Sequence, residues 1–138
     1  MDQSVMRSIN SGLYIVERNI RNLINELEEN QGTDWILKKS VNDISEENAR
    51  YLTEKANVLL NEIRQLERIY KLEQTIDSMS WRLLNSLFEI WTILSDLTPE
   101  GLKGYGTMTA EETRVLTDHV NKIMDLCNEM RNTLSNQR

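Results

Sequence analysis

The sequence predicts an all-α protein, and three observations support this prediction. Glycine and proline are both absent from Asn42 to Leu97 and again from Thr107 to the C-terminus. Proline stops helices because it lacks a backbone N–H, and glycine stops them because of its backbone entropy. Apolar residues recur at alternating three- and four-residue steps, which is the helical period. Residues that cap helix N-termini precede two of these periodic segments.

The first helix is expected from about Gln3 to about Asn30. Its apolar stripe places one residue on the same face at every turn. The stripe comprises Val5, Ile9, Leu13, Val16, Ile20, Leu23 and Leu27. Gly32 follows the last periodic residue, where a left-handed helix C-cap is usual, so we expect the helix to end there.

Residues 33–41 (TDWILKKSV) connect the first helix to the second. Trp35, Ile36 and Leu37 are too apolar for a free linker. We therefore expect a short helical connector near residues 33–40, packed over one end of the helices.

The second helix is expected to begin at Asp43 or Ser45, whose side-chain oxygens suit an N-cap. Its apolar stripe comprises Leu52, Ala56, Leu59, Ile63, Leu66 and Tyr70, and the phase then shifts to Leu72, Ile76, Met79 and Leu83. Two explanations remain open for this shift. Either residues 45–97 form one helix of about 80 Å, or the chain turns near Asp77 and Ser78. We favour the turn because it yields helices of matched length, although the absence of glycine there argues for one helix.

The last helix has the clearest beginning. Residues 98–107 hold Pro99 and three of the five glycines, so they form a connection between helices. Thr109 and Glu112 then match the spacing of a capping box. The following stripe comprises Leu116, Val120, Ile123, Cys127, Met130 and Leu134. Together these elements predict an elongated, coiled-coil-like antiparallel four-helix bundle with a short helical connector, in a single domain over residues 1–138.

Composition narrows the classes of function. The formal net charge of -6 does not attract phosphate backbones, so we do not expect nucleic-acid binding. The only cysteine, Cys127, has no partner for an internal disulfide, which favours a reducing compartment. Residues 1–12 lack the apolar core of a signal peptide, and no apolar run is long enough to span a membrane. These features predict a cytoplasmic protein that does not engage a membrane.

Metal and cofactor sites are not expected. A di-iron carboxylate bundle needs Glu-x-x-His pairs from two helices, but the chain has one histidine, His119, and a leucine at position 116. His119 and Cys127 lie about 12 Å apart along a helix, too far to share one metal ion. The glycines of residues 101–106 follow a helix and do not form a phosphate-binding loop.

Arg114 and His119 suggest one enzymatic reading. The segment Arg114-Val-Leu-Thr-Asp-His119 has the Arg-x4-His spacing and resembles the HEPN-type ribonucleases, which are all-helical domains of similar size. The resemblance implies that Arg114 steadies phosphate charge and that His119 transfers a proton. It covers six residues and departs from the family pattern at Val115, where a polar residue commonly follows the arginine. The two residues also lie about 140° apart around an ideal helix.

The predicted third helix carries two apolar stripes. One comprises Leu83, Leu87, Ile90, Leu94 and Leu97, and the other comprises Trp81, Leu84, Phe88 and Trp91. So broad an apolar face belongs either to a helix central in its own bundle or to one shared with another molecule. Aromatic residues are frequent anchors of interfaces. We therefore take Trp81, Leu84, Phe88 and Trp91 as candidate protein-interface residues, most simply in a homodimer.

These observations lead to a first functional hypothesis and two alternatives. The first is a non-enzymatic interaction module, such as a small acidic adaptor, inhibitor or chaperone-like subunit, that binds another protein or itself through apolar helix faces. The second is a HEPN-like ribonuclease that uses Arg114 and His119. The third is a structural subunit of a larger assembly, such as a phage or secretion component.

Overall fold

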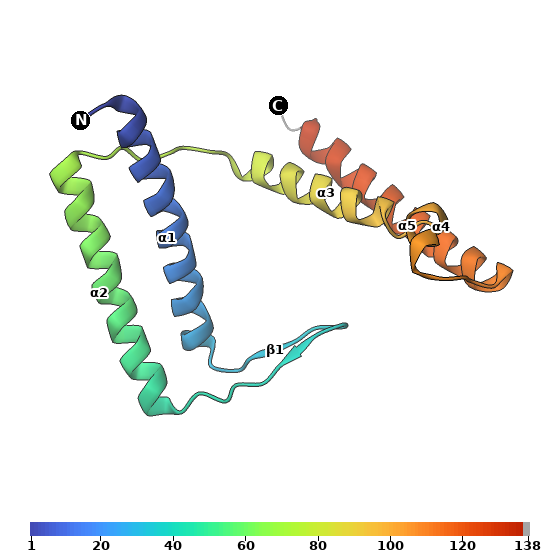
Figure 1. Ribbon diagram of the computed structural model, residues 1–138, viewed down its shortest axis with the longest axis horizontal. Coiled ribbons are helices and arrows are strands. Elements are labelled where there is room, and N and C mark those ends of the chain that lie inside the picture. The colour runs from blue at the N-terminus through green and yellow to red at the C-terminus, as the bar shows by residue number, and fades with distance from the viewer. Residues whose placement is uncertain (137–138) are drawn as a thin grey trace. The chain divides into compact units, whose positions relative to one another are not determined.

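The chain is mostly helical, as the sequence predicts. The computed structural model describes residues 1–136 and is shown in Figure 1. Its elements are α1 (Gln3–Glu29), β1 (Thr33–Asp34), β2 (Lys39–Ser40), α2 (Glu46–Tyr70), α3 (Met79–Ser95), α4 (Pro99–Leu102), the 3-10 helix η1 (Lys103–Tyr105) and α5 (Ala110–Ser135). Contacts divide the chain into two compact units, Met1–Gln74 and a second that begins at Thr75.

The first unit is a helical hairpin in which α1 and α2 lie side by side, and we call it the N-terminal hairpin (Figure 1). Its core consists of the buried side chains of Ile20, Ala56 and Leu60. Ile24 and Ile63 are partly buried and pack against this core. The small side chain of Ala56 brings the two helix backbones close, so α1 and α2 bury one narrow seam between them.

Helix α1 ends at Glu29, and Asn30 is its C-cap. Asn30 adopts a left-handed conformation, with φ of 53°, and its N–H donates to the carbonyl of Glu26. The prediction that Gly32 caps this helix is wrong. Asparagine tolerates the left-handed conformation, so Asn30 forms the C-cap two residues before Gly32. Gly32 also has a positive φ, of 68°, and lies in the loop that leads to β1.

Residues 33–40 form a β-hairpin, so the predicted helical connector is wrong. Thr33 pairs with Ser40 in two antiparallel strands, and the N–H of Trp35 donates to the carbonyl of Lys38 over 2.9 Å. The predicted packing over the helices is also wrong, because Ile36 and Leu37 are 99% and 96% exposed. The strands are Thr33–Asp34 and Lys39–Ser40, and the apolar residues lie in the turn between them. The run has no helical period that would oppose a hairpin.

Gly32 provides a test of how this hairpin is anchored. A Cβ at position 32 would collide with the carbonyl oxygen of Ser40, and the positive φ is strained for any residue with a side chain. We expect Gly32→Ala to lower the free energy of unfolding by about 1–2 kcal/mol. Urea denaturation followed by circular dichroism measures this change. Gly104→Ala is the control, because a Cβ there meets no atom within 4 Å; equal effects of the two substitutions would contradict the prediction.

Residues 45–97 form two helices and not one, so the break that we favour between the second and third helices is confirmed. Helix α2 begins after Ser45, whose Oγ accepts from the N–H of Asn48, and it ends at Tyr70. Lys71 adopts a left-handed conformation with φ of 53° and closes the helix without a glycine. Helix α3 restarts after Ser78, whose Oγ accepts from the N–H of Trp81 over 3.1 Å. The missing glycine therefore does not require one continuous helix.

The second unit pairs α3 with α5, and we call it the C-terminal hairpin (Figure 1). Its buried side chains are Leu87 and Leu94 on α3 and Val120 and Cys127 on α5. Each pair is seven residues apart, so the seam follows two helical turns of each helix. Cys127 is a free, buried cysteine that packs as a small apolar residue.

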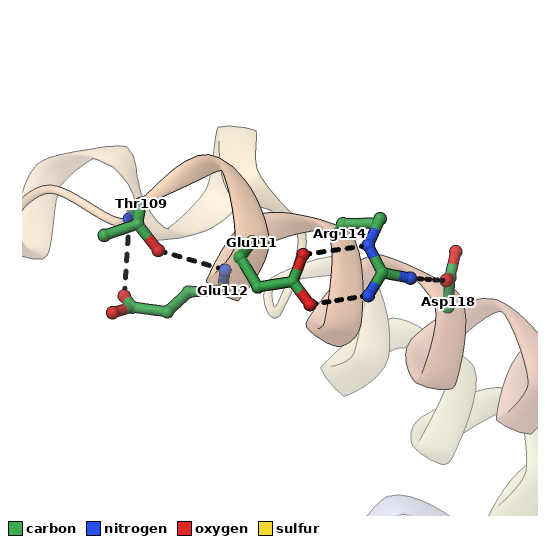
Figure 2. A network of polar contacts seen from close by, with 5 residues as sticks. All are labelled: Thr109, Glu111, Glu112, Arg114 and Asp118. Atoms are coloured by element: carbon green, nitrogen blue, oxygen red, sulfur yellow. Dashed lines mark hydrogen bonds and ion pairs between the residues drawn. The ribbon is translucent and has the colours of Figure 1, made fainter.

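The connection between α3 and α5 is itself helical. Thr98 caps α4, and Pro99 occupies the first turn, where its missing N–H costs no hydrogen bond. The predicted capping box of α5 is confirmed. The N–H of Glu112 donates to Thr109 Oγ1 over 3.1 Å, and the N–H of Thr109 donates to Glu112 Oε2 over 3.4 Å (Figure 2).

Candidate protein-interaction surfaces

The aromatic stripe of α3 lies largely outside the core of its own hairpin. Trp81 and Phe88 are 58% and 66% exposed, and Trp91 is 41% exposed. Leu84 is partly buried. Phe88 follows the buried Leu87, so it points about 100° away from the seam. Trp81 is seven residues before Phe88 and shares its side of the helix. We call these four residues the aromatic stripe.

The N-terminal hairpin exposes a second apolar surface, which we call its open face. It comprises Val16 and Leu23 on α1 and Leu52 and Leu59 on α2, all of them exposed. Leu23 and Leu52 line one cleft, which places them on the same side of the hairpin. Because the helices are antiparallel, seven residues back along α1 and seven forward along α2 lead to Val16 and Leu59. These two residues therefore form a second level of the same face.

The open face corrects part of the helix stripes expected from the sequence. Val5, Val16 and Leu23 were expected to pack with Ile20, but they are exposed. On α2, Leu52 and Leu59 are exposed, whereas the neighbouring Leu60 is buried. The apolar stripe of each helix is wider than the contact with one neighbouring helix, so only one edge of it is covered.

The C-terminal hairpin repeats this arrangement. Leu83 and Ile90 on α3 are exposed, as are Ile123 and Met130 on α5. Each pair is again separated by seven residues, and the helical period places both pairs beside the buried seam. The sequence stripe of Leu83, Leu87, Ile90, Leu94 and Leu97 therefore divides into a buried edge and an exposed edge.

The cleft at the end of the N-terminal hairpin is mainly apolar. It has a volume of about 390 Å³ and lies where α1 ends and α2 begins. Leu23, Leu27 and Leu52 line it together with residues 40–44. Glu26, Glu29 and Asp43 are its acidic residues, but no group of three metal-ligating side chains lies close together anywhere in residues 1–136.

Arg114 and His119 do not form a joint site in the structure. The guanidinium of Arg114 is paired on its own helix, with Nη2 2.6 Å from Glu111 Oε1 and Nη1 3.3 Å from Asp118 Oδ2 (Figure 2). The hydrogen bond to Glu111 is the main cause that raises the pKa of Arg114 above its ordinary value. His119 is exposed and has no partner among the hydrogen bonds of the described residues. The arginine is thus engaged by two carboxylates and is not held toward the histidine.

The tip of the β-hairpin is an exposed apolar site that sequence reasoning missed. Trp35 is exposed together with the two residues that follow it. Its apolar composition was the available signal, but apolar composition alone does not distinguish an exposed tip from a packed turn.

Two findings bear on the classification of the chain. In the described part of the chain, no helix combines the length and the apolar character that crossing a membrane requires. No protein-family model matches the chain, and no curated protein or solved structure is significantly similar to it.

Proposed function

We propose that this protein is a non-enzymatic interaction module that binds other proteins through apolar helix faces. The exposure of Trp81 and Phe88 on one side of α3 is the observation that supports this function most directly. Contact of large aromatic side chains with water is unfavourable in free energy, and such side chains are the usual anchors of protein interfaces. An adaptor, an inhibitor or a chaperone-like subunit would all use such a surface.

The antiparallel four-helix bundle belongs to the same proposal. Each hairpin is a two-helix layer with one apolar edge uncovered, and a second two-helix layer would complete a bundle around it. The seven-residue spacing of the exposed residues supports this arrangement, because it is the spacing at which facing helices interlock. A single domain over residues 1–138, a homodimeric state and a cytoplasmic location remain parts of the proposal.

Photocrosslinking tests the aromatic stripe as an interface. A photoreactive phenylalanine analogue at position 88 should crosslink one protein in stoichiometric amount in cells that express the chain. The same analogue at position 89 is the control, because Glu89 is a neighbouring exposed position outside the stripe. Trp81→Ala should weaken binding of the identified protein about tenfold or more. Equal crosslinking at positions 88 and 89, or none at either, would contradict the proposal.

The ribonuclease alternative predicts a different result. If His119 transfers a proton during RNA cleavage, the purified protein cleaves RNA and His119→Ala abolishes the cleavage. Absence of cleavage by the unmodified protein removes this alternative. The third alternative, a subunit of a larger assembly, predicts filaments or rings, which light scattering detects at high protein concentration.

A further inference from the structure

We propose that the open face of the N-terminal hairpin is covered by the same face of a second copy of this chain. The proposal rests on the proposed function, because it assigns one apolar helix face to self-association. It leaves the aromatic stripe of α3 for a different protein.

The open face has the length that a stable interface needs. On α1, Val16 and Leu23 lie about 10 Å apart, and the exposed Val5 lies on the same side of the helix, so the exposed apolar residues from Val5 to Leu23 extend over about 27 Å. Two adjacent helices are about 20 Å wide, so the outline of this side of the hairpin covers about 540 Å². A standard interface buries about 800 Å² of accessible surface on each partner, and accessible area exceeds the outline because side chains are corrugated.

The face is free of charge, so it is compatible with a copy of itself. With 100° per residue, no charged residue of α1 or α2 lies within about 40° of the line that joins the exposed apolar residues. Arg7, Glu17 and Arg21 project from other sides of α1. A charged face would repel its own copy, because like charges would meet across the symmetry axis.

Two residues on the outer edge of α2 specify how the copies align. Lys55 and Glu62 are seven residues apart and flank the open face on the same edge. Leu59 lies between them, four residues after Lys55 and three before Glu62. A two-fold axis that crosses α2 at the level of Leu59 brings Lys55 of one copy level with Glu62 of the partner subunit.

In this alignment α2 runs antiparallel to α2 of the second copy. The outer edge of α2 in one copy then faces the same outer edge in the other copy. Antiparallel helices use such edge positions to select partner and orientation through opposite charges. Neither Lys55 nor Glu62 takes part in an ion pair within residues 1–136, and Lys55 instead lies 5.5 Å from the centre of the Tyr51 ring. Both charges are therefore available to a second copy.

Sedimentation equilibrium of the full chain tests the proposal. We expect a mass twice the 16.2 kDa of one chain at micromolar concentration. Leu59→Gln should raise the dimer dissociation constant about tenfold or more, because Leu59 lies at the centre of the interface. Val58→Gln should leave it unchanged, since Val58 is equally exposed, at 55% against 53%, but lies about 100° further round the helix.

Charge reversal gives an independent result at two exposed positions where folding is not at risk. Lys55→Glu alone and Glu62→Lys alone should each weaken the dimer, because each places like charges level with one another. The double variant should restore dimerisation, since the charges again alternate across the axis. Circular dichroism confirms that each variant is helical before its mass is measured.

Three outcomes would overturn the proposal. The first is a monomer up to about 100 μM, whatever then covers the open face. The second is a dimer that Leu59→Gln does not weaken. The third is a double charge variant that dimerises more weakly than either single variant. Crosslinking at position 88 is unaffected by all three, so failure here is distinguishable from failure of the proposed function.

Discussion

Leu60→Ala should destabilise the N-terminal hairpin by about 2–4 kcal/mol. Leu60 is one of three buried residues in the core of this hairpin, together with Ile20 and Ala56. Truncation removes buried apolar surface and leaves a cavity that two rigid helices close only in part. Ile20 is the one other large side chain among the three buried residues, so little remains to compensate for the loss.

Native-state hydrogen exchange measures this effect at the helices concerned. Amide protons of α1 and α2 should exchange faster in Leu60→Ala by a factor that corresponds to the lost stability. Val58→Ala is the matched control, because Val58 is exposed and two residues away. We expect it to change stability by less than about 0.5 kcal/mol. Similar exchange in both variants would show that Leu60 is not part of a stable core.

Leu59 and Leu60 show where sequence reasoning reached its limit. Both residues are leucines on α2, and the spacing pattern selects Leu59 for the stripe, whereas the structure buries Leu60. The apolar stripe of α2 is wide enough to include either residue. The edge of α2 that is buried is the edge that contacts α1. This contact is between residues far apart in the sequence, so the local pattern of α2 does not reveal it.

The N-termini of the helices were predictable because their signals are local. Ser45, Ser78 and Thr109 each accept a hydrogen bond from an N–H three residues later. This chemistry involves only neighbouring residues, so it is visible in the sequence.

The β-hairpin was not predictable because residues twelve apart hold its base. The side chain of Asn42 donates to the carbonyl of Asn30 over 3.0 Å, and its Oδ1 accepts from the N–H of Ile44. These bonds join the end of α1 to the chain that precedes α2. Neither asparagine belongs to the apolar pattern from which a helical connector was inferred.

The candidate sites also differ in whether local sequence reveals them. The aromatic stripe was recognised from its composition, and its exposure follows from α5 covering only one side of α3. The open faces were not recognised, because an exposed apolar residue and a buried one look alike in a helical pattern. The pairing of Arg114 with Glu111 and Asp118 follows from ordinary three- and four-residue spacing on a helix.

Leu87→Ala should reduce stability and Phe88→Ala should reduce binding, although the two residues are adjacent. Leu87 is buried in the seam between α3 and α5, whereas Phe88 is 66% exposed. Truncation of Leu87 should lower the free energy of unfolding of the C-terminal hairpin by about 2–4 kcal/mol. Phe88→Ala should change it by less than about 0.5 kcal/mol, because most of the ring already contacts solvent.

The fluorescence of Trp81 and Trp91 during urea denaturation reports the stability of this hairpin when Trp35, which lies in the N-terminal hairpin, is replaced by phenylalanine in every variant. Binding to the protein crosslinked at position 88 gives the second measurement, and Phe88→Ala should weaken it about tenfold or more. A large loss of stability in Phe88→Ala would instead place the ring in a core. The aromatic stripe would then serve the fold, and its exposure could no longer support a role in binding.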